Sequence, residues 1–321
     1  MSIYVSGSLA YDRIMSFPGL FEDHILPDKL HIVNISFLVD DVREHCGGTA
    51  GNISYTAALL GEKPIALASV GNDFDRYERR MKKLGMPLEG IRHVENEFTA
   101  LCFITTDRAD NQITGFCPSA MGYPCKYAFK NIDTKTDIGI VAAGNMQDMQ
   151  HYPLFFKEKG IRYIYDPSQQ IPRLSAEELE NSITGAFMFI SNDYELEMVM
   201  KALGMSNKDE LLELTPNIVT TLGAQGAFLL TREEQTHIPA VLTEAVKDPT
   251  GAGDSMRGGM LAALHEGKDL VEAIQIGTVA ASFCVEQYGT QEHFFDKETF
   301  DYRYAKAFGK DADDWPFGPA L

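Results

Sequence analysis

The stretch "DPTGAGDSMRGGMLAAL", residues 248–264, places small residues and a carboxylate directly before a segment with helical periodicity. Gly251, Ala252 and Gly253 carry no large side chains, so their backbone N–H groups can converge on an anion at the positive end of the helix dipole. Asp254 follows them and offers a carboxylate that can take a proton from an attacking hydroxyl. The pattern therefore predicts a site of phosphoryl transfer, with Asp254 as the base.

An N-cap carboxylate that satisfies the first amides of the helix is the alternative role for Asp254. A cap needs one polar residue, whereas this turn clears space for several amides and then adds the acid, which favours the base. In a loose phosphoryl transfer the hydroxyl loses its proton late, so the low intrinsic pKa of an Asp does not disqualify it. The stretch is not a Walker A loop, because that loop requires Gly-Lys-Ser/Thr and none follows. It also does not match G-x-G-x-x-G, because Met256 occupies the position of the third glycine.

The stretch "HCGGTAGNISYTAALLG", residues 45–61, contains a second glycine turn before a helix. Gly48 and its neighbours allow a close backbone approach, and Asn52 offers both a donor and an acceptor, which suits a polyhydroxylated ligand. Asp12 lies shortly after the first strand-like segment, where an acid can accept hydrogen bonds from two neighbouring sugar hydroxyls. An ordinary glycine turn and an ordinary turn Asp are the alternatives.

Two further turns suit a nucleotide and its metal ion. In "SNDYELEM", Asn192 and Glu195 lie three apart at a helix start and can hold a hydrated Mg²⁺, mainly through its waters. An ordinary capping box is the alternative for this pair. The stretch "TTLGAQGAFLL" can run under nucleotide phosphates or form a hairpin turn, and its residues for either role are Thr220, Thr221, Gly223 and Gly226.

The elements that position these residues follow from hydrophobic periodicity. Short apolar runs alternate with helix-period segments, which predicts an α/β fold: a doubly wound, mostly parallel sheet flanked by helices. Terminal glycines end two of the expected helices. No repeat or linker interrupts the pattern, so we expect one domain over residues 1–321. The expected strands are 65–70, 137–144, 161–166, 186–191 and 217–223, and the clearest helices are 74–85 and 193–204.

Two segments, 29–45 and 98–117, carry β-branched and aromatic residues without an intervening helix, as strands of a small antiparallel sheet would. We expect a lid inserted at about 12–45 and 95–118 that excludes water during reaction. An antiparallel edge of the main sheet is the alternative. Exposed edge strands invite pairing, so we also expect a homodimer through the lid.

Composition excludes several classes of function. The net charge of −18 and pI near 4.8 argue against binding to nucleic acid or anionic membrane, because no surplus of Lys and Arg displaces counterions. The first residues have neither a basic start nor a long apolar run, so we expect no secretion signal or membrane anchor. An odd number of scattered cysteines suits a reduced cytoplasm: Cys46, Cys102, Cys117, Cys125 and Cys284.

The motifs "GGTAGN", "SNDYE", "TTLGAQG" and "DPTGAGD", in this order, resemble those of the ribokinase-like, or PfkB, carbohydrate kinase family over nearly the whole chain. The stretches "GSLAYDRIMSFPG", "SFLVDDVREHCGGTAGN", "DPSQQIPRLS" and "YGTQEH" are similar to the bacterial adenosine kinases of this family. The resemblance implies transfer of the γ-phosphoryl group of ATP, with Mg²⁺, to the 5′-hydroxyl of adenosine in purine salvage. It also implies a monovalent cation such as K⁺ near the anion site.

The same resemblance implies how the acceptor is held: hydrogen bonds to the ribose, stacking on the adenine and a lid that closes over both. It makes Asp254 the base for the 5′-hydroxyl, beside an anion hole for the γ-phosphate. The residues assigned to the ribose are Ser8, Asp12, Gly48 and Asn52, those near the adenine are Phe116, Gln169 and Gln170, and Ser36 closes from the lid.

One position departs from the family pattern. Similar kinases have an aromatic residue in the lid strand where this chain has Cys102, and alternation directs the neighbouring Phe103 to the opposite face. Other nucleosides and small sugars such as ribose therefore remain alternative acceptors. A catalytically silent nucleoside-binding protein is a second alternative, which the intact Asp254 disfavours. A dinucleotide-dependent oxidoreductase is disfavoured because G-x-G-x-x-G does not follow the first strand.

Overall fold

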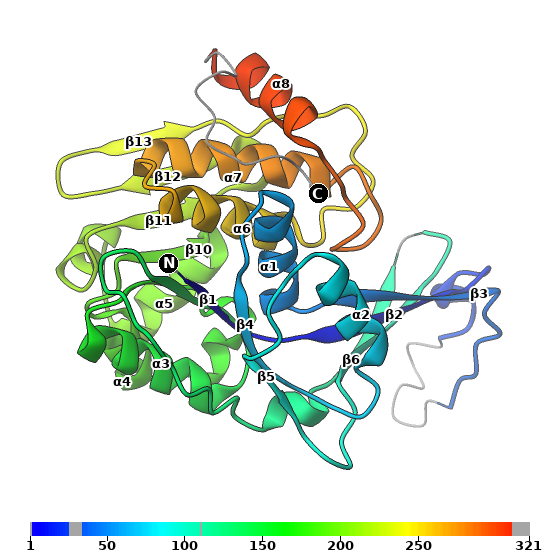
Figure 1. Ribbon diagram of the computed structural model, residues 1–321. Helices are drawn as coiled ribbons and strands as arrows, with labels where there is room; N and C mark the ends of the chain where they lie inside the picture. Colours follow the sequence, from blue (N-terminus) through cyan, green and yellow to red (C-terminus); the bar gives the residue numbers. More distant parts are fainter. Residues whose placement is uncertain (1, 26–33, 110, 310–321) are drawn as a thin grey trace.

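The computed structural model describes residues 2–25, 34–109 and 111–309, and within them two sheets form (Figure 1). The strands of the main sheet are β1 (Ile3–Ser6), β4 (Ile65–Val70), β5 (Ile91–His93), β8 (Ile138–Val141), β9 (Arg162–Tyr165), β10 (Met188–Asn192), β11 (Ile218–Thr221), β12 (Ala227–Leu230) and β13 (Gln235–Ile238). Their order is β13-β12-β11-β10-β9-β8-β1-β4-β5, with antiparallel pairing at β11–β12 and β12–β13. The predicted doubly wound, mostly parallel sheet is confirmed.

Helices cover both faces of this sheet (Figure 1). One face carries α1 (Thr49–Leu59), α6 (Ala252–His265), α7 (Leu270–Cys284) and α8 (Lys297–Phe308), and the other carries α3 (Met146–Lys159), α4 (Ala176–Ile183) and α5 (Asp193–Leu203). Helix α2 (Asp75–Lys83) packs beside β4. Short 3₁₀ helices occupy Phe21–Asp23, Ser119–Gly122, Ser168–Arg173, Lys208–Glu213 and Gly223–Gln225.

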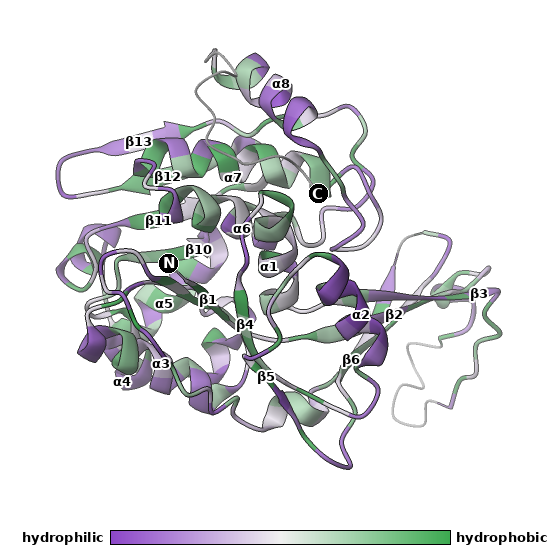
Figure 2. Ribbon diagram, viewed as in Figure 1, coloured by the Kyte–Doolittle hydropathy of each residue, from purple (hydrophilic) through white to green (hydrophobic). Residues whose placement is uncertain are grey.

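The core lies in the layers between sheet and helices. Successive side chains of a strand point to opposite faces, so Ile3 and Val5 of β1 pack in the layer with α6 and α7, while Tyr4 packs in the layer with α3. Both faces of β1 are therefore apolar, as expected for a strand of a covered parallel sheet. Figure 2 shows hydrophobic residues concentrated in the central strands and in α6 and α7, and hydrophilic residues on α2 and β13.

The predicted elements form near their predicted positions. Each of the five expected strand segments contains a strand, and β4 has the predicted bounds. The two expected helices are α2 and α5, and the glycines that follow them, Gly85 and Gly204, have φ of 69° and 70°. A left-handed residue after a helix is the usual glycine termination, which explains why these ends were predictable.

A separate sheet of order β3-β2-β6-β7 projects from the main body (Figure 1). Its strands are β2 (Ala10–Ser16), β3 (Asp41–Gly47), β6 (Ala100–Thr106) and β7 (Gln112–Cys117). The alternative, an antiparallel edge of the main sheet, is therefore wrong. The small sheet is mixed, not antiparallel as predicted, because β2 and β6 both leave the carboxyl end of the main sheet and pair in parallel. Residues 34–39 carry no regular secondary structure, so the expected strand over 29–45 is limited to β3, and its residues 29–33 lie outside the described residues.

Residues 255–264 of helix α6 are all buried, on every side of the helix. It lies between α1 and α7 and packs closely against both. A Cβ at Gly258 would lie 2.5 Å from the carbonyl oxygen of Ile53, and one at Gly259 would lie 3.0 Å from Cα of Gly277. The two glycines therefore permit helix contacts that any side chain would block. No described helix has the length and apolar character needed to cross a membrane.

Candidate active site

The strand order reverses between β1 and β8, and ligands of open α/β sheets bind at the carboxyl ends of the strands at such a point. Ser8, just after β1, accepts a hydrogen bond from the amide of Thr49 at 3.0 Å. The hydroxyl of Thr49 donates to the carbonyl of Ala143, just after β8, at 2.6 Å. Gly48 has φ of 88°, and a Cβ there would lie 2.6 Å from the carbonyl oxygen of Ser8. The beginning of α1 is thus held at the reversal point.

The start of α6 presents backbone amides toward a pocket. Gly251 is the N-cap and has φ of 82°, a conformation that favours glycine. The amide of Ala252 donates to the carbonyl of Pro249 at 3.2 Å. The first-turn amides of Gly253 and Asp254 have no acceptor within the helix, as at any helix start. Together with the dipole of a 14-residue helix, these two amides form a candidate anion site.

Asp254 is the third residue of α6, so its interpretation as the N-cap is wrong, and Gly251 occupies that position. Its Oδ2 accepts a hydrogen bond from Nδ2 of Asn52 at 2.8 Å. Burial raises the pKa of the Asp254 carboxyl to about 6, while the Asn52 bond and the Arg257 guanidinium lower it. At neutral pH this carboxylate is charged, and its pKa is close enough to 7 for it to accept a proton.

A chain of hydrogen bonds connects Asp254 to the glycine turn before α1. Oδ1 of Asn52 accepts from Nε2 of Gln291 at 3.0 Å, and the same nitrogen donates to the Tyr77 hydroxyl at 2.6 Å. That hydroxyl donates to the carbonyl oxygen of Gly47 at 2.9 Å. The amide nitrogen Nε2 of Gln291 can donate a hydrogen bond but cannot accept one. The side chain of Asn52 must therefore direct its oxygen to Gln291 and its NH₂ group to Asp254.

Arg257, one turn further along α6, forms a buried ion pair with Asp166, which follows β9. Nε and Nη2 of Arg257 bind the two carboxylate oxygens of Asp166 at 2.5 and 3.1 Å. Nη1 donates to the carbonyl oxygen of Gly253 at 3.1 Å. Arg257 therefore holds the backbone of the candidate anion site, and its charge lowers the pKa of Asp254 while that of Asp166 raises it.

The second part of the site lies on the small sheet. Asp12 of β2 is directly paired with His45 of β3 and Cys102 of β6. Cys102 is in turn paired with Phe116 of β7. Directly opposite residues project to the same face, so these four side chains form one row across the sheet. Phe103 projects to the other face, as the alternation predicted.

Burial raises the pKa of Asp12 to about 6, and two neighbouring ionisable groups act in opposite directions. His45 lowers this pKa and Asp248 raises it. A Cβ at Gly47 would collide with the Asp12 carboxylate. The absence of a side chain at Gly47 therefore leaves room for the Asp12 carboxylate. The sequence did not reveal this role of Gly47.

A pocket of about 660 Å³ extends from the start of α6 to the ends of β10 and β11. Thr221, Gly223 and Gly226 line it, whereas Thr220 is not among its described lining residues. β11 and β12 are joined through this turn as an antiparallel hairpin, so the hairpin alternative is confirmed, and the same turn lines the pocket. Leu242 also lines the pocket, and 76% of its surface is exposed. The pocket therefore offers apolar surface to a ligand.

Asn192 and Glu195 line the same pocket and form the capping box that was the alternative to a metal site. The amide of Glu195 donates to Oδ1 of Asn192 at 2.7 Å, and the amide of Asn192 donates to Oε2 of Glu195 at 2.9 Å. Burial raises the pKa of Glu195 and the charge of Asp166 raises it further, whereas the Asn192 amide and the Arg257 charge lower it. Two carboxylates, Asp193 and Glu195, line this end of the pocket.

The remaining predicted residues are Gln169, Gln170 and Ser36. Gln170 is buried and donates to the carbonyl of Gly144 at 3.2 Å while it accepts from Arg173 at 3.2 Å. Gln169 is exposed on the same short helix. Ser36 is exposed in the irregular segment before β3. None of the three shares a hydrogen bond with Asp12 or Asp254 within the described residues.

Sequence reasoning missed four residues that support the site. Arg257 carried a signal, because a charged residue inside an apolar helix pattern needs a buried partner. Asp166 carried a weaker one, since it ends an apolar run at the carboxyl end of a predicted strand. Nothing in the sequence indicated that Tyr77 and Gln291 approach Asn52, from 25 and 239 positions away.

Comparison with known proteins gives consistent results. The model of the pfkB family carbohydrate kinases matches residues 19–297. A nucleoside kinase of Methanocaldococcus jannaschii is 32% identical over 267 residues, which cover 82% of this chain and 87% of that protein.

Solved structures agree with this similarity. The nucleoside kinase of Burkholderia thailandensis in complex with inosine is 34% identical, with a TM-score of 0.84 over 97% of this chain and 99% of that one. The same enzyme in complex with ADP-inosine has a TM-score of 0.83 and covers 100% of this chain and 99% of that one.

Proposed function

Since the chain belongs to the pfkB family of carbohydrate kinases, we propose that it transfers the γ-phosphoryl group of ATP to the 5′-hydroxyl of adenosine. Membership of the family and similarity to nucleoside kinases make it a phosphotransferase that acts on a nucleoside or a sugar. The finer proposal is an adenosine kinase that forms AMP and ADP in purine salvage in the cytoplasm.

One observation carries the proposal: the Asp254 carboxylate, held by Asn52 at 2.8 Å, lies in the first turn of α6 beside the candidate anion site. The turn combines a proton acceptor with donors for the migrating phosphoryl group. In the proposed reaction the 5′-hydroxyl oxygen bonds to the γ-phosphorus and the bond from that phosphorus to the bridging oxygen of ADP breaks. The hydroxyl proton passes to Asp254.

The 660 Å³ pocket is the proposed donor site. Its size is in the range of small-molecule pockets, and it adjoins the start of α6. Thr220, Thr221, Gly223 and Gly226 belong to the turn proposed to lie under the nucleotide phosphates. A relative that binds ADP-inosine supports a nucleotide donor.

The residues at this end of the pocket fit a magnesium ion. The carboxylates of Asp193 and Glu195 line this end of the pocket, and carboxylate oxygens are ligands that Mg²⁺ accepts. Asn192 and Glu195 would hold the ion through its waters, since Mg²⁺ keeps several waters in such sites. When bound, the ion would neutralise charge on the donor phosphates.

A K⁺ ion is part of the proposal only through the family resemblance. A comparison of kinase activity in KCl and in NaCl tests it.

The acceptor site is proposed on the side of the small sheet that carries Asp12. Asp12 would bind the ribose 2′- and 3′-hydroxyls, and Phe116, which is 51% exposed, would stack on the base. Ser8, Gly48 and Asn52 complete the ribose side of the proposal, whereas Gln169, Gln170 and Ser36 are assigned by resemblance alone. The small sheet, with about residues 12–45 and 95–118 of the single domain, would act as the lid.

The identity of the base is the least constrained part of the proposal. Cys102 in the row between Asp12 and Phe116 replaces an aromatic ring, and the similar Burkholderia enzyme was solved with inosine. Inosine is therefore the second candidate acceptor, and ribose is the sugar alternative. A coupled ADP-release assay with adenosine, inosine, 2′-deoxyadenosine and ribose ranks them by kcat/KM. Ribose as the best acceptor would contradict the nucleoside proposal.

The same assay tests whether the chain is a catalytically silent binding protein. No ADP release with any acceptor, together with nucleoside binding by calorimetry, would establish that alternative. The proposed homodimer through the lid is supported by the exposure of β7, all six residues of which are exposed at the sheet edge. Sedimentation of the parent and of an Ile113→Lys variant tests it.

A further inference from the structure

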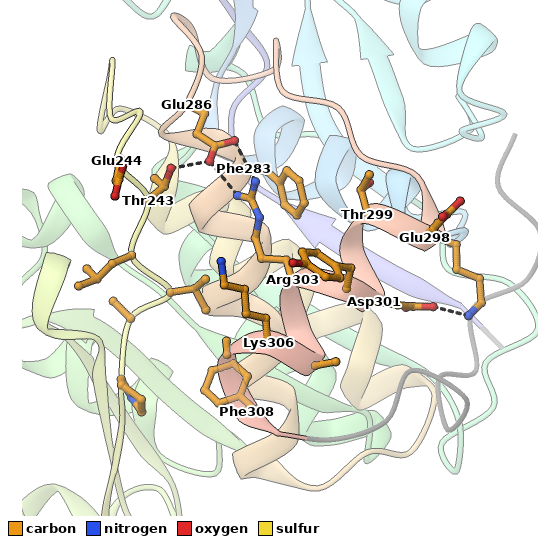
Figure 3. Close-up of a pocket in the computed structure, with 18 residues that line it drawn as sticks. Thr243, Glu244, Phe283, Glu286, Glu298, Thr299, Asp301, Arg303, Lys306 and Phe308 are labelled. Carbon is orange, nitrogen blue, oxygen red and sulfur yellow. Dashed lines mark hydrogen bonds and ion pairs between the residues drawn. The ribbon is translucent and has the colours of Figure 1, made fainter.

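A second groove lies outside the proposed active site. It has a volume of about 1460 Å³ and lies between α8, the end of α7 and residues 239–244 (Figure 3). Residues 240–243 also line the donor pocket, so this segment separates the two hollows. We call residues 240–243 the shared wall. Any displacement of the shared wall changes the shape of the donor pocket.

The shared wall has no regular secondary structure. A segment without ladder hydrogen bonds depends on side-chain contacts for its position. Thr243 supplies such a contact, because its hydroxyl donates to Oε1 of Glu286, just after α7, at 2.6 Å. On the donor side, Leu242 exposes 76% of its surface to the pocket and the solvent.

Arg303 of α8 holds Glu286 in place (Figure 3). Its Nη1 and Nη2 lie 3.0 and 3.1 Å from Oε1 and Oε2 of Glu286, a bidentate pair. The guanidinium also lies 3.6 Å from the ring centroid of Phe283. Nη1 donates to the hydroxyl of Ser282 at 3.0 Å, and Ser282 lines the donor pocket.

We propose that Arg303 is a positioning residue for the donor nucleotide, through Glu286 and Thr243 to the shared wall and through Ser282 to a second part of the pocket lining. Arg303 does not itself line the donor pocket. Arg303 lines the groove beside α8, and its planar guanidinium donates to both carboxylate oxygens of Glu286. A lysine cannot reproduce this arrangement, because its ammonium is a point charge without a fixed fork. The inference rests on the proposed use of the pocket by ATP.

The experiment compares three variants of the full chain. Arg303→Lys keeps the charge but removes the bidentate pair, and Thr243→Val removes the wall contact with almost no change in shape. Lys306→Met is the matched control, since Lys306 lines the same groove but makes no hydrogen bond or ion pair within the described part of the chain. Steady-state kinetics give kcat and both KM values, and calorimetry gives the ADP dissociation constant.

We expect the KM for ATP and the dissociation constant of ADP to rise about tenfold in Arg303→Lys and Thr243→Val, the usual effect of one lost hydrogen bond to a charged group. The kcat and the KM for the nucleoside should stay at the parent values, and Lys306→Met should match the parent throughout. Because both variants act through Glu286, the double variant should weaken ADP binding by less than the product of the single effects.

Two results would overturn the inference. The first is parental ADP affinity in folded Arg303→Lys and Thr243→Val proteins, with folding checked by thermal unfolding. The second is a fall in kcat and a rise in the KM for the nucleoside that are as large as the rise in the KM for ATP. Such a result would indicate a general structural role for Arg303. A parent protein that neither binds ADP nor consumes ATP would instead overturn the proposed function, so the two failures are distinguishable.

Discussion

Nδ2 of Asn52 lies 2.8 Å from Oδ2 of Asp254, although the two residues are 202 positions apart. Asn52 belongs to the first turn of α1, which follows the small sheet, and Asp254 belongs to the helix that begins at the proposed donor pocket. Their hydrogen bond joins the proposed acceptor and donor sides of the site. It also orients the carboxylate oxygen that would receive the proton.

Asp254→Asn removes the proton acceptor but keeps an oxygen that Asn52 can bind. We expect kcat to fall by about 10²- to 10⁴-fold, the usual contribution of a general base. Nucleoside affinity should change little, because the substituted group has the same size. Steady-state kinetics and calorimetric binding of adenosine test this expectation, and comparable losses in turnover and affinity would make Asp254 a structural residue.

Activity should fall on the acidic side of a pH profile. Burial raises the pKa of Asp254 to about 6, so the base is protonated and inactive below that pH. The pKa of Asp12 is also raised to about 6, and its protonation weakens ribose binding in the same range. We expect kcat at saturating nucleoside to report Asp254, with Asp12→Asn leaving the kcat profile in place. A flat kcat profile between pH 5 and about 8, in a range that brackets both groups, would contradict the role of Asp254.

Asp254→Asn should also stabilise the folded protein at neutral pH. The pKa of Asp254 rises from 3.8 to about 6 on folding, so its favourable contribution is complete below pH 3.8 and is lost as pH rises through about 6. At pH 7 the charged, buried carboxylate therefore costs about 3 kcal/mol, which the neutral amide avoids. Thermal unfolding should show a higher Tm for the variant at pH 7.5 and a smaller difference at pH 5. A lower Tm at pH 7.5 would contradict the argument.

Gln291→Glu tests the chain of hydrogen bonds behind Asn52. A carboxylate cannot donate to Oδ1 of Asn52 or to the Tyr77 hydroxyl, so Asn52 loses the contact that fixes its amide orientation. We expect kcat to fall by about tenfold or more, in proportion to a lost hydrogen bond. Tyr77→Phe removes the far end of the chain and should have a smaller effect. If Tyr77→Phe is as damaging as Gln291→Glu, general loss of packing explains both.

Asp12→Ala should weaken nucleoside binding more than turnover, the reverse of Asp254→Asn. The parent should discriminate between adenosine and 2′-deoxyadenosine by about tenfold or more, because the deoxy compound leaves the carboxylate without one hydrogen bond. In Asp12→Ala this discrimination should disappear. Arg13→Ala is a suitable control, since its side chain projects to the other face, 5.8 Å from the Phe103 ring centroid. Equal discrimination in the Asp12 variant and the parent would remove the ribose role.

Elements with short-range signals were predictable. β4 coincides with the predicted 65–70 because an uninterrupted apolar run is typical of a strand with two covered faces. α5 ends where Gly204 adopts a left-handed backbone conformation, as its sequence indicated. The alternation of β6 placed Cys102 and Phe103 on opposite faces, since the period of a strand is two.

Where one sequence pattern fits two different structures, the sequence did not decide between them. The spacing of Asn192 and Glu195 suits a metal ion and also a capping box, and the structure contains the capping box. Asp254 was open between cap and base, and the left-handed Gly251 takes the cap position. The difference depends on backbone angles at one residue, which composition does not specify.

The sequence by itself determined the order of strands and helices, the glycine turns and the chemical types at the candidate site, because these depend on near neighbours in the chain. Only the tertiary structure decided which groups meet: Arg257 with Asp166, 91 positions apart, and Gln291 with Asn52, 239 apart. Such pairs form when helices and strands pack, and a polar group that loses water during packing must find a partner. The choice of partner is set by the packing of α6 and the loop after α7, which no local pattern encodes.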